Sequence, residues 1–574
     1  GCNNITVKNC KVTLTRDPNG WGNYAYCRDH YFSTGIKASA FTSTHLGATN
    51  FFEGGNPNGG IKSMTDVHRN CVVIGNEIDN CTYGITFADR WAEAGGNVFA
   101  GAGNIIGQSG SGNTITNWGL KPGTNIAYGN NESDMGRVVA GIAIGGQKDY
   151  TIEYNTVSNM GNNTLSTASS PISYCGILAG TGYDGNHWPH FAAGFFAKIN
   201  HNTISGIDVT TGAVDNVKAA YGISFAQFAD HVTNTNLSSR PATGNVEITN
   251  NNISGITVKG GDCQGISCKY FYEYWKRSFA TDDRTGGFQS NATVTINNNT
   301  IKGMTFLTRA SNDAYNHGTL NAIYWMHGQN NLYIENNTIG GAGADGIVRG
   351  VASHLYIARH LVGTRVIYAN AQFDRGTRSL VQVNGNTITN VDAIANNAMT
   401  GANNWGVGFS GIFVDKGATT NNIQNNTISD CDVACGSRNS DVEVEVSFIR
   451  FAGKPRAGNS TSNVSGNQIL NNTRTSYKYY GTNWGTNAFT AGIFSRYDAT
   501  GQTKNIYNNV IDDLTGVAAN ATSSHLYHAR IEGIKVYSRG AGSVVNVYGN
   551  AIKNLGGDTY NYAQTAAQND INNY

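Results

Sequence analysis

A short motif recurs along most of the 574-residue chain at nearly regular intervals. An apolar residue is followed by two variable residues, an asparagine, one variable residue, and then isoleucine or valine, as in INNNTI at 296–301. Eleven intervals separate the first copy from the last, and they average about 43 residues. This period predicts a solenoid, in which each repeat is one structural unit stacked on the next. The copies end at Ile78, Ile115, Val157, Ile204, Ile253, Ile301, Ile339, Ile388, Ile428, Ile469, Ile511 and Ile552.

Residues in and around the motif alternate between apolar and polar, as in VTINNNTI at 294–301. A period of two is typical of β-strands, and the chain holds only 7 prolines, which would interrupt strands. A second signal, glycine or alanine followed by isoleucine, falls between the copies, as in YGISF at 221–225 and AGIFS at 491–495. Each repeat therefore holds at least two short strands, and we expect no long helix.

Asparagine accounts for 74 of the 574 residues. It tolerates the left-handed backbone of tight bends, and its side-chain amide both donates and accepts hydrogen bonds. We therefore expect the motif asparagines to form a ladder at a bend, with Ile296 and Ile301 pointing into the core and Gly303 beginning an insertion. The predicted ladder consists of Asn202, Asn251, Asn299, Asn337, Asn386, Asn426, Asn467, Asn509 and Asn550.

The two signals together resemble the coils of right-handed parallel β-helices of the pectate-lyase-like superfold, which commonly read as GI, a bend and NNTI. The resemblance covers roughly residues 3–556 and extends to the repetitive regions of large secreted or cell-surface bacterial proteins. It implies an all-β fold, a single right-handed parallel β-helix of about 12 or 13 coils. At about 4.8 Å per coil, the solenoid would be a rod near 60 Å long.

The repeat length leaves two interpretations of a coil. Coils of that superfold are often shorter than these repeats, so a repeat is either one coil with insertions or two coils, one of them poorly marked. Only 10 residues separate Ile142 from Ile152, which favours one coil with insertions stacked along its edges. We expect the β-helix over residues 1–556, with a long insertion at about 13–70, and a polar segment or linker at 557–574.

Aromatic residues gather between the motifs, in segments such as YFYEYWKRSF at 270–279 and the related HLYIAR at 354–359 and HLYHAR at 525–530. The two related segments are four repeats apart, so we expect them at equivalent places. If these rings are exposed, they can stack on sugars. We favour the alternative, in which the rings pack together and form a small satellite core over the solenoid flank. The glycan-binding candidates are Trp275, Tyr272, Trp405, Trp484, Tyr356 and Tyr527.

Many proteins of the superfold cleave polysaccharides, so the chain is examined for acids and bases. Hydrolysis needs two suitably spaced carboxyl groups, and a lyase needs a base beside cationic groups. The weak catalytic candidates are His354, Arg359, His525 and Arg530, for which a structural role is favoured. The acidic residues of the strand at 440–451 are expected to be solvated. We predict no metal site and no cofactor.

The ten cysteines permit disulfides in an oxidising compartment, for example Cys71 with Cys81, or buried free thiols; both interpretations stay open. The net charge is +1, with no basic run, which gives no footprint for nucleic acid. No apolar run is long enough to span a membrane. Without obvious polar caps, the coil ends are expected to contact other copies of the chain or further segments of a longer protein.

These features favour an extracellular or cell-surface structural and adhesive protein: a rigid fibre, spacer or coat segment that presents aromatic loops and could bind cell-surface glycans. The alternative, from another class, is a polysaccharide lyase or glycoside hydrolase of the pectate-lyase-like superfold. Both rest on the fold-level resemblance, which constrains architecture far more than chemistry.

Overall fold

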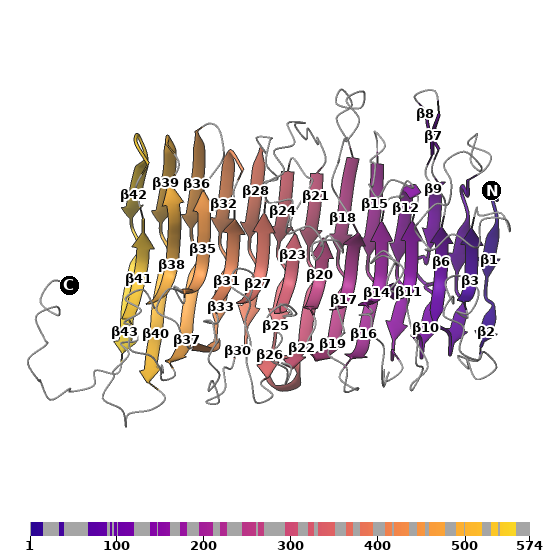
Figure 1. The fold of residues 1–574 in the computed structure, drawn as a ribbon, viewed down its shortest axis with the longest axis horizontal. Helices are drawn as coiled ribbons and strands as arrows, with labels where there is room; N and C mark the ends of the chain where they lie inside the picture. The colour runs from indigo at the N-terminus through magenta and orange to yellow at the C-terminus, as the bar shows by residue number, and fades with distance from the viewer. Residues whose placement is uncertain are drawn as a thin grey trace, which may run out of the picture.

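Three long parallel sheets form the protein, as the computed structural model shows (Figure 1). The chain passes through sheets A, B and C in turn and repeats this circuit, which makes a single right-handed parallel β-helix of 13 coils counted by the strands of sheet A. The structure describes residues 2–14, 34–39, 67–88, 92–94, 97–99, 101–119, 138–145, 147–160, 173–180, 195–209, 219–226, 244–259, 262–268, 293–307, 320–325, 331–350, 363–370, 379–393, 408–415, 418–435, 445–453, 459–476, 489–498, 500–518, 530–537 and 540–557.

The strands of each sheet follow one another in sequence order. Sheet A contains β1 (Thr6–Lys8), β4 (Val72–Ile74), β9 (Gly101–Ile106), β12 (Gln147–Glu153), β15 (Phe195–Asn200), β18 (Gly244–Thr249), β21 (Thr293–Asn297), β24 (Asn331–Glu335), β28 (Leu380–Asn384), β32 (Thr420–Gln424), β36 (Ser460–Ser465), β39 (Gln502–Tyr507) and β42 (Val544–Tyr548). Sheet C contains β3 (Thr34–Ser39), β6 (Tyr83–Ala88), β11 (Val138–Gly145), β14 (Ser173–Gly180), β17 (Ala219–Ala226), β20 (Asp262–Cys268), β23 (Leu320–Trp325), β27 (Gly363–Asn370), β31 (Gly408–Asp415), β35 (Glu445–Gly453), β38 (Phe489–Asp498) and β41 (Arg530–Val536).

Sheet B carries the second half of each motif. It contains β2 (Lys11–Thr13), β5 (Glu77–Asp79), β10 (Thr114–Thr116), β13 (Thr156–Ser158), β16 (Thr203–Val209), β19 (Asn252–Lys259), β22 (Thr300–Leu307), β25 (Thr338–Gly340), β26 (Ile347–Gly350), β29 (Thr387–Thr389), β30 (Val391–Ala393), β33 (Thr427–Ser429), β34 (Asp432–Cys435), β37 (Gln468–Ser476), β40 (Val510–Ala518) and β43 (Ala551–Gly557). The described residues also hold an antiparallel pair, β7 (Ala92–Ala94) and β8 (Asn97–Phe99), and the 3-10 helix η5 (Gly343–Asp345).

The register shows that neighbouring strands come from successive repeats. Ile253 pairs with Ile301, which pairs with Ile339 in the next strand. Each motif therefore supplies one strand of sheet A and one of sheet B, and the Gly-Ile signal supplies sheet C. The strand β3 lies inside the stretch 13–70 that the sequence suggested as an insertion, and it pairs with β6 as the first strand of sheet C.

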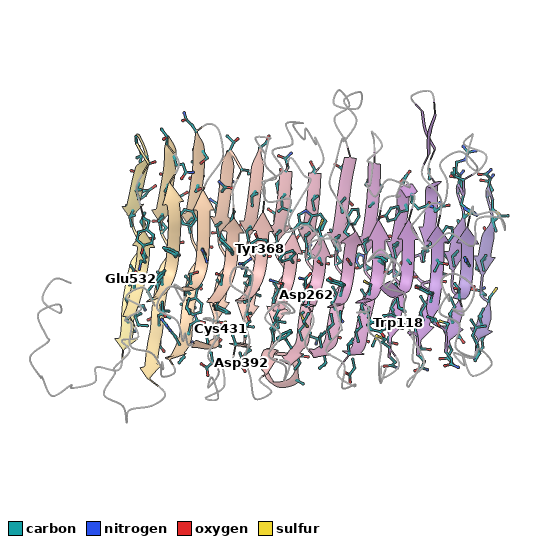
Figure 2. All side chains as sticks on the ribbon, in the orientation of Figure 1. Trp118, Asp262, Tyr368, Asp392, Cys431 and Glu532 are labelled. Carbon is teal, nitrogen blue, oxygen red and sulfur yellow. The ribbon has the colours of Figure 1, made fainter. Side chains whose placement is uncertain are left out.

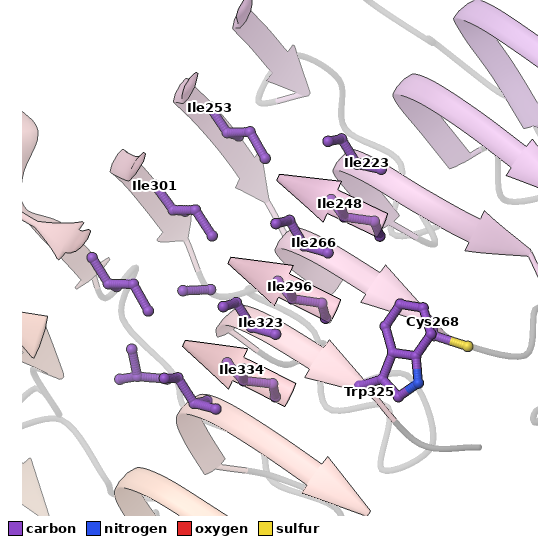
Figure 3. Packing of buried hydrophobic residues seen from close by; sticks show 14 of the residues in the cluster. Ile223, Ile248, Ile253, Ile266, Cys268, Ile296, Ile301, Ile323, Trp325 and Ile334 are labelled. Carbon is purple, nitrogen blue, oxygen red and sulfur yellow. The ribbon is translucent and has the colours of Figure 1, made fainter. Parts of the chain in front are cut away.

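The interior is a continuous column of apolar side chains, because inward positions repeat in register along every sheet. Ile296 and Ile301 are fully buried, as predicted. The glycine of the Gly-Ile signal has a steric reason: a Cβ on Gly222 would lie 2.6 Å from a side-chain methyl of Ile253. Figure 3 shows part of the column, namely Ile223, Ile248, Ile253, Ile266, Cys268, Ile296, Ile301, Ile323, Trp325 and Ile334.

The predicted asparagine ladder forms at the corner between sheets A and B. Asn299 is buried; its Nδ2 donates to Oδ1 of Asn337 at 2.9 Å and to the carbonyl of Ile248 at 2.8 Å. The same pattern joins every predicted member from Asn202 to Asn550. The Asn299 side chain thus satisfies a backbone carbonyl and a backbone N–H of the preceding coil and donates to the side-chain amide of the following coil.

We expected one asparagine both to take the left-handed backbone and to form the ladder, but two neighbouring residues divide these roles. The residue before the ladder asparagine takes the left-handed backbone, as Asn298 does at φ 57°, while Asn299 makes the ladder bonds. The expectation for Gly303 is wrong: it lies inside β22, where its φ of 59° bends the strand. Because β22 continues to residue 307, no insertion begins at Gly303.

Cysteine occupies the first described rung of this ladder. The backbone N–H of Cys10 donates to Oδ1 of Asn76, and its thiol donates to the carbonyl of Lys8. An asparagine at a rung also donates its side-chain N–H to the preceding coil, as Asn76 does to the carbonyl of Val7. The Cys10 thiol instead donates to a carbonyl of its own coil. Cys431 repeats the arrangement, since its backbone N–H donates to Oδ1 of Asn472 and its thiol donates to the carbonyl of Ser429.

The eight described cysteine side chains are free thiols, so the disulfide interpretation does not hold for them.

Candidate functional site

The side chains of all ten residues predicted to bind glycan or act in catalysis lie outside the described part of the chain; Arg530 contributes only its backbone, as the first residue of β41. Their sequence positions nevertheless adjoin sheet C. Tyr272 and Trp275 follow β20, and Trp405 and Trp484 precede β31 and β38. The outer face of sheet C is therefore the described surface that bears most directly on the predicted sites.

The two related HLY segments lead into β27 and β41, which are four strands apart in sheet C. The sequence distances from the two segments to these strands are not identical. Following the register from strand to strand aligns Thr364 with Ile531. Arg359 is five residues before Thr364, whereas Arg530 immediately precedes Ile531. Counted from this register, the two segments are therefore offset by four residues in sequence, and their side chains lie outside the described residues.

A row of aromatic and cationic side chains runs along the outer face of sheet C. It is formed by the residue that follows the central isoleucine in the last six described strands of sheet C. Tyr324 stacks on Tyr368 with ring centroids 4.9 Å apart, and Tyr368 contacts Phe413 at 5.4 Å. These three rings are only 4–5% exposed although they lie on the outer face of the β-helix. The row consists of Tyr324, Tyr368, Phe413, Arg450, Phe494 and Lys535.

Cations lie against these rings at short range. The guanidinium carbon of Arg365 lies 4.9 Å from the ring centre of Tyr368, and that of Arg450 lies 4.4 Å from Phe413. Lys535 Nζ lies 3.5 Å from the ring centre of Phe489. Cation–π contacts of this kind stabilise a desolvated cation and fix its position on the sheet.

The one carboxylate in the described outward rows of these strands is Glu532, whose Oε2 lies 3.4 Å from Lys535 Nζ (Figure 2). The two residues form an ion pair three positions apart, with the Lys535 and Glu532 side chains only 11% and 17% exposed. A single carboxylate cannot supply the acid and base that glycoside hydrolysis needs. The described rows therefore form a packed, aromatic and cationic surface.

A pair of carboxylates occurs instead on the outer face of sheet B. Asp392 of β30 and Asp432 of β34 pair in register on neighbouring strands, whose backbones lie about 4.8 Å apart. Partial burial, together with the charge of Asp432, raises the pKa of Asp392 above its ordinary value. Cys431 lies beside this pair (Figure 2), and burial raises the pKa of its thiol to about 12.

Sequence reasoning missed the carboxylate pair because 40 residues separate its members. A signal was present: Asp392 and Asp432 each lie four residues after the last isoleucine of a motif, Ile388 and Ile428. The aromatic row had a weaker signal, since each member directly follows an isoleucine, but only some of these isoleucines follow glycine or alanine. Outward positions become visible only when the repeats are aligned by register.

Other kinds of site find no support among the described residues. No three His, Cys, Asp or Glu side chains in those ranges gather closely enough to hold a metal ion. None of the helical segments described is long and apolar enough to cross a membrane. Comparisons of the chain with protein families, curated proteins and solved structures found no match.

Proposed function

We propose that the chain is an extracellular or cell-surface structural and adhesive β-helix, a rigid segment of a fibre, spacer or surface coat. The observation that carries this proposal is the unbroken amide ladder from Asn76 to Asn550, which ties every coil to the next. With about 4.8 Å per coil, the rod is about 60 Å long. Such a scaffold holds loops at fixed spacing, which suits a presenting role.

Association of coils at an end of the rod is part of the proposal. In the last described coil, Val547, Ile552 and Leu555 are 49%, 43% and 39% exposed. The residues one coil earlier in the same columns are fully buried, including Ile511, the partner of Ile552. We infer that the end coil of another copy covers these apolar side chains, because burying them is favourable by roughly 25 cal/mol per Å².

Replacing Ile552 by lysine tests end-to-end association. Electron microscopy of the unmodified chain is expected to show rods of about twice the single length, while Ile552→Lys gives only rods of the single length. The matched control is Ala551→Lys, in which the lysine is on the outer face of the same strand. Single rods of the unmodified chain at all concentrations would overturn this part of the proposal, as would equal effects of the two lysines.

Adhesion is proposed to act through the aromatic segments beside sheet C. The cationic side chains of Arg365, Arg450 and Lys535 on the outer face of sheet C support a preference for anionic glycans over neutral ones. A glycan array on the intact chain, repeated with Trp275→Ala and Trp405→Ala, tests this. Binding that both substitutions leave unchanged, or no binding at all, argues against the adhesive role and leaves the scaffold role standing.

A glycoside hydrolase is the second candidate, and the pair of Asp392 and Asp432 favours it. Neighbouring strands place the two carboxylates near the roughly 5 Å separation that retaining hydrolases use, and a raised pKa suits a general acid. Turnover of a panel of neutral and acidic polysaccharides that is lost in Asp392→Asn and in Asp432→Asn would support it. Turnover that survives both substitutions excludes this pair as the catalytic acids.

A further inference from the structure

The outer face of sheet A carries no charged side chain across its last five described strands. On β28, β32, β36, β39 and β42, outward and inward residues alternate, and the outward ones stack in three rows. The middle row is made entirely of amides. The rows are Leu380, Thr420, Thr461, Thr503 and Val544; Gln382, Asn422, Asn463, Asn505 and Asn546; and Asn384, Gln424, Ser465, Tyr507 and Tyr548. We call these fifteen residues the amide face.

A second hydrogen-bonded ladder runs along the middle of the amide face. Asn463 Nδ2 donates to Oδ1 of Asn422 at 3.0 Å, Asn505 Nδ2 donates to Asn463 at 2.9 Å, and Asn546 Nδ2 donates to Asn505 at 2.8 Å. Beside it, the rings of Tyr507 and Tyr548 stack with centroids 5.1 Å apart and planes 6° apart. Unlike the ladder at the corner, this one lies on the surface of the rod.

The ladder leaves hydrogen-bonding capacity directed away from the sheet. A side-chain amide has two N–H donors and two acceptor lone pairs. Asn463 uses one donor toward Asn422 and one lone pair toward Asn505. One donor and one acceptor remain on each internal rung, at the spacing of the strands. The amide face is therefore complementary to itself in hydrogen bonding, and its lack of charge removes the repulsion that usually keeps sheets apart.

We propose that the amide face docks side by side on the amide face of a second copy of this chain. The rung spacing identifies the partner. Donors and acceptors that repeat about every 4.8 Å stay aligned over several rungs only with a surface of equal repeat, which another parallel in-register sheet provides. Paired sheets with low charge, amide ladders and stacked aromatic rings interdigitate well. The proposal builds on the rod of the proposed function and adds lateral contact to it.

The size of the amide face sets the expected strength. Five strands about 4.8 Å apart and five residues of about 3.3 Å each give a face of about 400 Å². This is about half of the roughly 800 Å² per partner that stable interfaces bury, so the association is weak and depends on concentration. Several such contacts along a longer fibre would add up through effective concentration.

Two lysines on the amide face test the proposal. Asn422→Lys/Asn463→Lys is to be compared with Thr427→Lys/Gln468→Lys, which places two lysines in the same two coils on the outer face of sheet B. Both variants gain the same charge. Sedimentation velocity is run from about 1 µM to about 1 mM, a range that covers weak interfaces, after circular dichroism shows that each variant folds. Asn546→Lys, at the exposed end of the ladder, serves if the double variant does not fold.

All three chains are measured with Ile552→Lys added, which removes the proposed end contact. The apparent mass of the chain without lysines on either face and of the sheet B variant is then expected to rise with concentration from 61.2 kDa toward twice that value, while the amide-face variant stays at 61.2 kDa. Ile552→Lys is expected to keep side-by-side pairs in electron micrographs and lose end-to-end ones, which separates this contact from the proposed end contact. The proposal is overturned if no side-by-side pairs form, if the amide-face variant still forms them, or if both double variants lose them equally.

Discussion

Asn426 donates its Nδ2 to Oδ1 of Asn467, 41 residues later, at 2.9 Å, and its own Oδ1 accepts the backbone N–H of Asn386 at 3.0 Å. One buried side chain thus bonds to backbone and amide groups of the preceding coil and to an amide group of the following coil. Because its removal leaves several of these groups without a partner in a dry interior, the ladder is a large contributor to the stability of each coil.

Asn426→Ala is expected to destabilise its coil by about 3 kcal/mol, since each buried group left without a partner costs about 1–3 kcal/mol. Hydrogen exchange of the neighbouring strands measures the effect locally, which suits a solenoid that does not unfold in one step. Asn422→Ala, in the same coil but on the surface, is the control and is expected to cost less than about 1 kcal/mol. Equal losses would show that burial of the ladder is unimportant.

Replacing Gly385 by alanine is expected to lower the stability of the protein for two separable reasons. Its φ of 67° is strained for any residue with a Cβ, by about 1–2 kcal/mol, and a Cβ there would collide with Oδ1 of Asn336. Gly343 has a similar φ of 61° with nothing near its missing Cβ. Gly385→Ala should therefore lower thermal stability more than Gly343→Ala does. If the two losses match, only the backbone strain matters.

The stacked carboxylates predict an unusual pH dependence. Burial and Asp432 raise the pKa of Asp392 in the folded protein above its unfolded value, so ionisation of Asp392 destabilises the fold. This destabilisation is absent below the ordinary carboxyl pKa and develops as the pH rises through the raised value. The stability advantage of Asp432→Asn over the unmodified chain should grow between about pH 4 and pH 7. Chemical denaturation at several pH values checks this; an advantage that is constant with pH would contradict the assignment.

Thiol reactivity should divide the cysteines by burial. Burial raises the pKa of Cys175 and Cys263 well above the ordinary range and that of Cys431 to about 12, whereas Cys2 and Cys10 are exposed. Because the thiolate is the nucleophile, iodoacetamide at neutral pH should label only the two exposed members of this set. Peptide mass spectrometry, with a denatured sample as control, measures the labelling. Native labelling of Cys175 would show that its coil opens.

The motif was sufficient to predict the fold, because it shows both periods that define a parallel β-helix. These are the two-residue alternation within a strand and the regular repeat of the motif along the chain. The alternation at 294–301 placed Ile296 and Ile301 inside, and the repetition of asparagine placed Asn299 in a ladder; both predictions are confirmed. The prediction for Gly303 failed for a physical reason. A glycine with positive φ can bend a strand as well as end it, and the sequence does not distinguish the two cases.

The surface was less predictable, because outward neighbours come from residues about 40 apart. Asp392 beside Asp432, and Asn422 beside Asn463, become partners only after the register is known. The residues chosen from aromatic segments, such as Trp275 and His354, lie outside the described ranges, and their roles stay predictions. A column-by-column alignment of repeats would have identified both surface pairs without a structure.

The two amide ladders point in opposite directions along the rod. At the corner, Asn426 donates to the following coil, whereas on the surface Asn463 donates to the preceding one. The amide dipoles of the two ladders therefore oppose each other, and parallel sheets themselves carry little net dipole. Over the last coils, where both ladders run, their amide dipoles partly cancel, so these coils add less to a net dipole along the rod than a coil that carries the corner ladder alone.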